Sequence, residues 1–160
     1  MTLAKLKTSI ALATALLGLT APAYGQTVRC VSVSDPDGWV NVRSVSTGEA
    51  IGTFETGTEF YTHQGEGEYA IVLEAPNLMV HRSRLQYADY ESACQNHHTV
   101  NDTDGYVNLR AEPGGTIIGR VSTGKIVLRI SENSGNWLRV LTPDGTFGYI
   151  HRSRLSLAHF

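Results

Sequence analysis

An internal repeat constrains the fold of this chain more than any other feature of the sequence. The pentapeptide HRSRL occurs twice, at 81–85 and at 151–155. Two further segments recur in the same order: DPDGWVNVRS (35–44) as DTDGYVNLRA (102–111), and AIGTFETG (50–57) as IIGRVSTG (117–124). These segments lie 67 positions apart and the pentapeptides 70 apart, so the second copy has three extra residues in between. Because such an insertion is typical of a loop-length change on a shared scaffold, the sequence indicates one structural unit used twice.

Each copy is predicted to consist of short β-strands. VNVRS (40–44) and YVNLRA (106–111) alternate apolar and polar residues, which turns one face of a strand inward. Gly, Asp, Asn and Pro separate the segments, as in the expected turns SENSGNW (131–137) and TPDGTFG (142–148). No segment after residue 25 has a helical period. We therefore predict an all-β fold with two tandem small barrels of about 60 residues each, whose cores are modest.

The first 25 residues have the layout of a secretory signal peptide. Lys5 and Lys7 precede an apolar stretch, and small residues stand before an expected cleavage between Gly25 and Gln26. A retained membrane anchor is the alternative, but the apolar stretch is shorter than the ~20 residues of a spanning helix. We therefore predict a cleaved signal helix at 1–25, no membrane span after cleavage, and a periplasmic or secreted protein.

The repeat divides the remaining chain into a first domain at 26–90, a linker at 91–101 and a second domain at 102–160. Without the two leader lysines, 11 basic residues stand against 15 acidic ones, a net charge of −4. This balance gives no reason to expect nucleic-acid binding, which needs a basic face. Acidic residues are concentrated in 26–100, which holds 10 acids and 4 bases.

Cys30 and Cys94 are the only cysteines, and both follow the predicted leader. Two thiols in an oxidising compartment most often form one disulfide. Cys30 precedes the opening strand of the first copy and Cys94 follows its closing HRSRL, and the first and last strands of a small barrel are neighbours. A bridge would close a loop of 64 residues and stabilise the first copy by roughly 4 kcal/mol in the chain-entropy model. The alternative, a catalytic cysteine paired with a histidine, lacks a recognisable nucleophile setting.

The second copy contains GYVNLRAEPGG (105–115), GNWLRV (135–140) and GYIHRSRL (148–155) in succession. In this order the segments resemble bacterial SH3 domains, and the resemblance covers nearly all of 26–160 as two tandem copies. The first copy departs from the pattern, because it has Tyr69 in place of Trp137 and EAPNLMV (74–80) in place of the late hairpin. The resemblance implies SH3-like barrels in which HRSRL forms the final turn and strand. Within each barrel, one asparagine is expected to tie down a loop through side-chain to backbone bonds: Asn41 and Asn108.

Exported bacterial SH3 domains commonly attach to cell-wall peptides, so the resemblance implies an exported, non-enzymatic binding protein. Its expected partner is the stem peptide of peptidoglycan or another peptide of the cell envelope. Aromatic and basic side chains are the candidate ligand-binding residues: Trp39, Tyr106, Arg110, Trp137, Tyr149, His151 and Arg152. The aromatic rings would offer flat contact surfaces, and the basic groups would meet carboxylates, which the arginine fork binds at two points. Alternatively, the aromatic residues are barrel core and HRSRL is a solvated closing turn.

A second hypothesis is an inhibitor, immunity factor or adaptor that binds a periplasmic or secreted enzyme, with the acidic first half steering a basic partner. A third hypothesis, an enzyme, lacks a nucleophile elbow, a zinc helix or a phosphate-binding glycine loop in the sequence. A metal site at Cys94, His97 and His98 is disfavoured, because adjacent histidines of an extended chain point in different directions. We therefore predict no enzymatic activity, no cofactor and no metal, and the sequence contains no feature that indicates an oligomeric state.

Overall fold

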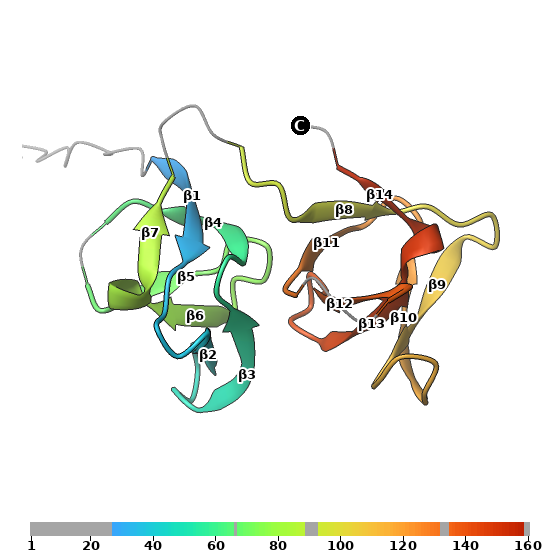
Figure 1. Cartoon of the computed structure of the whole chain (residues 1–160), viewed down its shortest axis with the longest axis horizontal. Coiled ribbons are helices and arrows are strands. Elements are labelled where there is room, and N and C mark those ends of the chain that lie inside the picture. Colours follow the sequence, from blue (N-terminus) through green and yellow to red (C-terminus); the bar gives the residue numbers. More distant parts are fainter. Residues whose placement is uncertain (1–26, 66, 89–92, 132–134, 159–160) are drawn as a thin grey trace, which may run out of the picture.

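The computed structural model describes residues 27–65, 67–88, 93–131 and 135–158, which form two β-barrels in series (Figure 1). The first barrel contains β1 (Val28–Val33), β2 (Trp39–Ser44), β3 (Ala50–Glu55), β4 (Glu59–His63), β5 (Tyr69–Ile71), β6 (Leu78–His81), the 3₁₀ helix η1 (Arg82–Arg84) and β7 (Leu85–Tyr87). The second contains β8 (His97–Val100), β9 (Tyr106–Arg110), β10 (Ile117–Ser122), β11 (Ile126–Arg129), β12 (Trp137–Leu141), β13 (Phe147–His151), η2 (Arg152–Arg154) and β14 (Leu155–Leu157). The predicted all-β fold is confirmed, whereas the predicted signal peptide lies outside the described residues.

The strands of each barrel pair in antiparallel order. The first barrel has a sheet of order β4-β1-β7 and a second of order β3-β2-β6-β5. The second barrel has a seven-stranded sheet of order β10-β9-β13-β12-β11-β8-β14. In both barrels the first strand pairs with the last, β1 with β7 and β8 with β14. HRSRL supplies the last turn and the start of the last strand, so it seals each barrel as the sequence predicts.

The two HRSRL segments adopt the same structure. The histidine Nδ1 accepts a hydrogen bond of 3.3 Å from the backbone N–H of the serine two residues later, in His81–Ser83 and in His151–Ser153. This bond caps the 3₁₀ helix, whose first N–H groups have no partner inside the helix. The leucine that follows each helix packs against the barrel core and begins the closing strand.

The second arginine of each HRSRL segment holds the loop that opens the repeat. Arg84 Nη1 lies 3.2 Å from Asp35 Oδ2, and Arg154 Nη1 lies 2.7 Å from Asp102 Oδ2. The other oxygen of each aspartate accepts a hydrogen bond of 2.9 Å from the backbone N–H two residues later, which closes the Asp-x-Asp-Gly turn. The opening turn and HRSRL therefore recur together because they form the two sides of one contact.

The loops after β2 and β9 are tied by arginines, whereas the sequence predicts that Asn41 and Asn108 tie them. Arg43 Nη1 donates to the Gly48 carbonyl at 2.8 Å, and Arg110 Nη1 donates to the Gly115 carbonyl at 2.5 Å. Asn108 Oδ1 is buried and has no hydrogen-bond partner among the described residues. The longer arginine side chain reaches a carbonyl five residues further along the chain, across the whole loop.

The predicted linker at 91–101 is shorter in the structure, because its residues 97–100 form strand β8. This strand pairs with β11 on one side and with β14 on the other, so the second barrel begins before the predicted residue 102. His97 and His98 are both buried in β8. Successive side chains of a strand point to opposite faces. His97 points toward the first barrel, where its Nε2 lies 2.6 Å from Glu74 Oε1.

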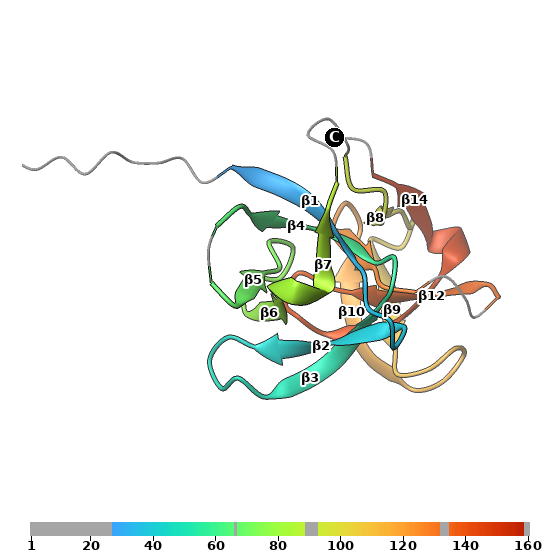
Figure 2. The same ribbon diagram turned by 60° about the vertical axis from the view of Figure 1, so that its left-hand side comes forward.

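The two barrels are neighbours in both views of the ribbon (Figure 1 and Figure 2), and they share a hydrophobic core. The buried cluster of the first barrel, which includes Phe54 and Phe60, continues into three residues of the second barrel: Leu128, Ile130 and Leu141. Phe147 of β13 is partly buried against this cluster, with its ring centroid 6.3 Å from that of Phe54. The hydroxyl of Thr58 also donates to the Ile130 carbonyl at 3.0 Å across the buried interface. The interface therefore fixes the orientation of the barrels.

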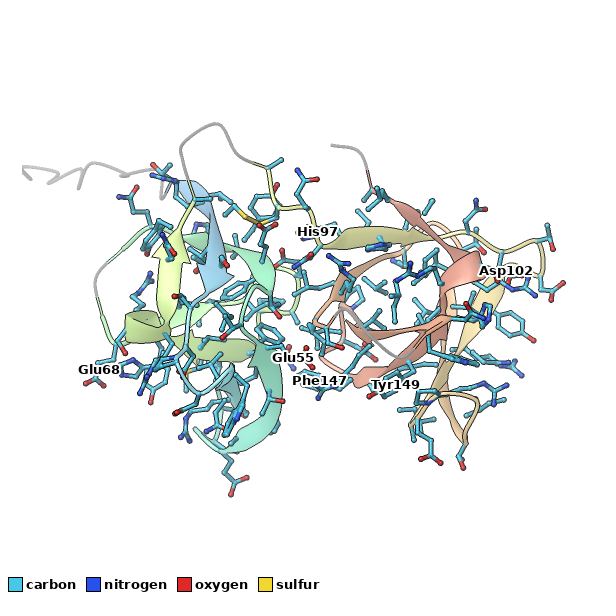
Figure 3. All side chains as sticks on the ribbon, viewed as in Figure 1. Glu55, Glu68, His97, Asp102, Phe147 and Tyr149 are labelled. Carbon is cyan, nitrogen blue, oxygen red and sulfur yellow. A yellow bond between two sulfur atoms is a disulfide. The ribbon has the colours of Figure 1, made fainter. Side chains whose placement is uncertain are left out.

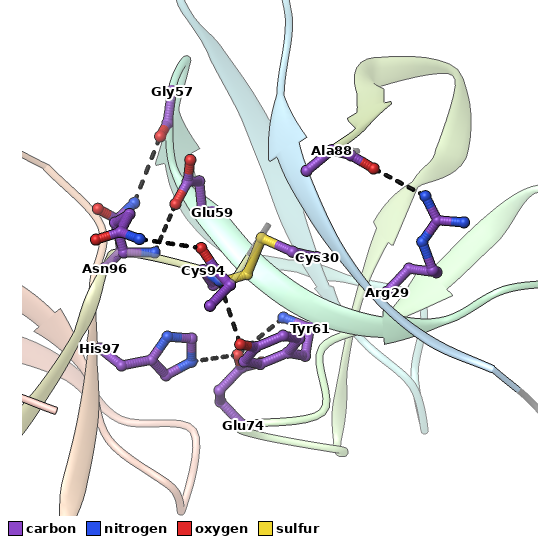
Figure 4. Close-up of a disulfide and its surroundings, with 12 residues drawn as sticks. Arg29, Cys30, Gly57, Glu59, Tyr61, Glu74, Ala88, Cys94, Asn96 and His97 are labelled. Atoms are coloured by element: carbon purple, nitrogen blue, oxygen red, sulfur yellow. Dashed lines mark hydrogen bonds and ion pairs between the residues drawn. A yellow bond between two sulfur atoms is a disulfide. The ribbon is translucent and has the colours of Figure 1, made fainter. Parts of the chain in front are cut away.

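The predicted disulfide between Cys30 and Cys94 is confirmed, with a Cα–Cα distance of 5.5 Å (Figure 4). It joins β1 to the chain segment just before β8. The backbone N–H of Cys94 donates to the Tyr61 hydroxyl at 3.2 Å, and that of Gln95 donates to Glu59 Oε2 at 2.7 Å. This segment is therefore held against β4 of the first barrel as it enters the second.

Candidate functional site

Four of the seven predicted ligand-binding residues gather in one pocket of the second barrel. Tyr106 and Arg110 lie at the two ends of β9, Trp137 begins β12, and His151 ends β13. The pocket has a volume of about 210 Å³ and is completed by further residues of the barrel: Asp102, Asp104, Val107, Asn108, Ile150 and Arg154. Strands β12 and β13 are neighbours with Trp137 opposite His151, so the sheet register brings these two residues together.

The aromatic rings of the pocket contact neighbouring histidine and arginine side chains. The rings of Trp137 and His151 meet edge to face, with centroids 5.2 Å apart and an interplanar angle of 89°. The Arg110 guanidinium lies 5.8 Å from the centroid of the Trp137 ring, within the range of a cation–π contact. On the pocket rim, Tyr106 is 36% exposed and has the Arg120 guanidinium 4.4 Å from its ring centroid.

The polar groups of the pocket carry both signs of charge. Asp102 and Arg154 neutralise each other in the ion pair described above, and Figure 3 places Asp102 at the outer edge of the second barrel. Asp104 is exposed, and Arg110 has N–H donors beyond the one it gives to Gly115. The pocket can therefore receive both a cationic and an anionic group of one ligand.

The three remaining predicted residues lie elsewhere. Trp39 is in the first barrel, where it lines a separate pocket of about 200 Å³. Tyr149 is half-buried in β13, where it pairs with Arg139, two residue pairs along the ladder from Trp137 and His151. Arg152 is exposed in η2 and is not among the described residues that line the pocket.

Four polar residues of the pocket are not among the predicted ligand-binding residues, namely two aspartates, an asparagine and an arginine: Asp102, Asp104, Asn108 and Arg154. Their signal was present, because the Asp-x-Asp-Gly segment and the second arginine of HRSRL both recur in the repeat. Within the described ranges, no three His, Cys, Asp or Glu side chains are grouped closely enough to hold a metal ion. None of the helical segments in these ranges has the length and apolar character that a bilayer span requires.

Comparison with known proteins finds a sequence family that matches part of the second barrel. The family described as the bacterial SH3 domain matches residues 105–156. No curated protein sequence matches the chain.

Three solved structures are similar to the chain at low identity. NlpC1 from Trichomonas vaginalis is 17% identical over 85% of this chain and 48% of that chain, with a TM-score of 0.35. NlpC2 from the same organism is 17% identical over 82% of this chain and 48% of that chain, with a TM-score of 0.35. The endolysin LysPBC5 CBD is 12% identical over 83% of this chain and 96% of that chain, also with a TM-score of 0.35. The chain thus spans about half the length of the two Trichomonas proteins.

Proposed function

Residues 105–156 belong to the bacterial SH3 family, and from this premise we propose that the protein is a non-enzymatic binding protein of the cell envelope. Its proposed ligand is the stem peptide of peptidoglycan, or another short envelope peptide, in the pocket of the second barrel. The observation that carries this proposal is the pocket itself, which gathers Tyr106, Arg110, Trp137 and His151. The Cys30–Cys94 disulfide supports a periplasmic or secreted location, since such bonds persist in oxidising compartments.

The pocket offers a group for each chemical part of a short peptide. The rings of Tyr106 and Trp137 give apolar faces, and the exposed carboxylate of Asp104 attracts an ammonium group. The free donors of Arg110 suit a carboxylate. The Asn108 amide has a buried oxygen without a partner among the described residues, and a buried acceptor gains most from a donor such as a peptide N–H.

His151 has a defined role in this arrangement. Its Nδ1 accepts hydrogen bonds within η2, from the Ser153 backbone at 3.3 Å, so the ring hydrogen resides on Nε2. Nε2 is therefore the nitrogen that can donate to a ligand carbonyl or carboxylate. The edge-to-face contact with Trp137 keeps the ring in place for this bond.

The proposal is tested by binding to purified peptidoglycan sacculi at low salt, together with calorimetric titration of a soluble stem peptide. The wild-type protein is expected to bind both. Tyr106→Ala is expected to weaken binding about tenfold or more, because aromatic anchors carry much of the energy of a binding site. Leu157→Ala is the control, since Leu157 is 58% exposed in the same barrel and is not among the pocket residues.

Retention of neither sacculi nor stem peptide would refute the cell-wall ligand. Equal loss of binding in Tyr106→Ala and Leu157→Ala would move the site away from the pocket. Crosslinking to an envelope protein in the absence of sacculus binding would favour the inhibitor, immunity-factor or adaptor hypothesis instead.

A further inference from the structure

We infer that the first barrel carries a second ligand pocket, equivalent to that of the second barrel, and that the protein binds peptide-bearing polymers at two points. This inference rests on the proposed function and extends it. Trp39 is the one predicted ligand-binding residue that lies in the first barrel, and it lines a pocket of about 200 Å³ there. The pocket of the second barrel has nearly the same volume, about 210 Å³.

The lining of the first pocket repeats that of the second, which has one further lining residue, Ile150. All nine residues that line the first pocket are counterparts, in the repeat, of residues that line the second. The charged counterparts include Asp37 for Asp104 and Arg43 for Arg110. The first copy departs from the family pattern in its late hairpin, yet this departure at 74–80 leaves the pocket intact because none of its lining residues comes from that stretch.

The internal contacts of the first pocket also match those of the second. The Asp35–Arg84 ion pair of the first barrel corresponds to the Asp102–Arg154 ion pair of the second. The rings of Tyr69 and His81 meet edge to face with centroids 5.2 Å apart and an interplanar angle of 75°. His81 Nδ1 is occupied by Ser83 at 3.3 Å, which leaves Nε2 as the donor here too. Arg43 again gives one η-nitrogen to its loop and retains further donors.

Some of these residues are needed by the barrel, and others are not. The aspartate–arginine pair and the capping histidine hold the closing turn, so any copy of this barrel has a structural use for them. Trp39 is 47% exposed, and Asp37 is exposed, so neither is explained by packing. Each pocket has one tryptophan and one tyrosine, but the two residue types exchange places between the copies. Trp39 corresponds to Tyr106, and Tyr69 corresponds to Trp137. We therefore expect the same class of ligand with a different affinity in each pocket.

The pockets lie toward opposite ends of the molecule. In Figure 1, η1 and η2 lie on the outer sides of their barrels, away from the interface. Figure 3 places Asp102 at one end of the molecule, and Glu68, whose carbonyl accepts from the Arg82 backbone at 2.7 Å, at the other. The shared core fixes this arrangement. Two-point binding therefore requires a polymer that repeats the peptide, and it raises the effective concentration at the second site.

The experiment compares a monovalent and a polymeric ligand. Titration with a soluble stem peptide prepared from purified peptidoglycan is expected to give two sites per chain. Trp39→Ala is expected to leave one site, and Trp39→Ala with Tyr106→Ala none. On intact sacculi, Trp39→Ala alone is expected to weaken retention about tenfold or more, because avidity is lost. Val45→Ala is the control, since Val45 is 45% exposed in the same barrel and is not among the pocket residues.

The outcomes separate this inference from the proposed function. One site in the wild-type protein, lost in Tyr106→Ala and unchanged in Trp39→Ala, would overturn the second pocket and leave the proposed function standing. Absence of binding by the wild-type protein would overturn both. Circular dichroism and thermal melting establish that Trp39→Ala is folded, and Asp37→Asn, an exposed change at the same pocket, replaces it if it is not.

Discussion

Replacement of Gly52 by alanine is expected to weaken the contact between the two barrels. Gly52 lies in β3 of the first barrel and faces the Phe147 ring of the second. An added Cβ would lie 2.6 Å from Cζ and 2.7 Å from Cε2 of that ring. Favourable carbon contacts are about 3.5–4.0 Å, so the ring must withdraw by about 1 Å. Phe147 packs against the shared core beside Phe54, which opposes this movement.

Overpacking of this kind costs about 1–3 kcal/mol. For a cooperative unit of this size, 2 kcal/mol lowers Tm by roughly 5–10 °C. The repeat provides the matched control, because Gly119 holds the same position beside the β-bulge of the second barrel. A Cβ at Gly119 would meet Leu109 at 3.9 Å, an ordinary contact, so Gly119→Ala is expected to change the free energy of unfolding by less than about 0.5 kcal/mol.

Urea unfolding, monitored by tryptophan fluorescence, measures the free energy of unfolding of both variants. Gly52→Ala should have a lower transition midpoint, and the double variant Gly52→Ala/Phe147→Leu should recover part of the loss because leucine makes room for the added methyl group. Equal midpoints for Gly52→Ala and Gly119→Ala would refute the close packing of β3 against β13.

Two further predictions concern the disulfide and the pH dependence of stability. The variant Cys30→Ser/Cys94→Ser is expected to lose roughly 4 kcal/mol of folding stability, because the disulfide closes a loop of 64 residues. Both barrels should melt together because they share a core. Calorimetry that shows a second barrel of unchanged Tm would contradict this expectation. The pKa of His98 is lowered from its usual value by burial first, and by the charges of Arg129 and Arg152 after it, against an opposing hydrogen bond to the Asn96 carbonyl. The unfolded chain therefore binds a proton at His98 more readily than the folded chain does. The contribution of His98 to folding stability is complete above the unfolded pKa of about 6.5, and it is lost as the pH falls through the folded pKa. Urea unfolding between about pH 7.5 and about pH 5 should show a smaller fall in stability for His98→Gln than for the wild-type protein, and parallel curves would contradict the assignment.

The sequence predicts those parts of the fold that depend on pattern and repetition. Period-two alternation in 40–44 and 106–111 marks β2 and β9, and turn residues mark the breaks. The repetition of HRSRL predicts the closing element, and the neighbouring first and last strands of a small barrel predict the Cys30–Cys94 bridge. In the pocket, the aromatic and basic residues are predicted because rings offer flat contact surfaces and basic groups bind carboxylates, whereas Asp104 and Asn108 are not among the predicted ligand-binding residues.

Strand β8 and the shared core were not predicted, because their cause lies in another part of the chain. HHTV (97–100) has no apolar alternation, and two adjacent histidines indicate a polar connector. They are buried in the structure since His97 meets Glu74 from the other barrel and His98 lies on the opposite face. Likewise, no local pattern shows that Leu128, Ile130 and Leu141 contact the first barrel rather than their own.

The position of β8 has a consequence for how the second barrel can be isolated. The family match begins at residue 105, after β8 has ended at Val100, yet β8 joins β11 to β14. A fragment cut to the match would leave two strands with open backbone edges, and it would present Phe147 and its apolar neighbours to water. Such edges and surfaces recruit other chains, so a fragment of 105–156 is expected to aggregate more readily than a fragment that includes β8 and the first barrel.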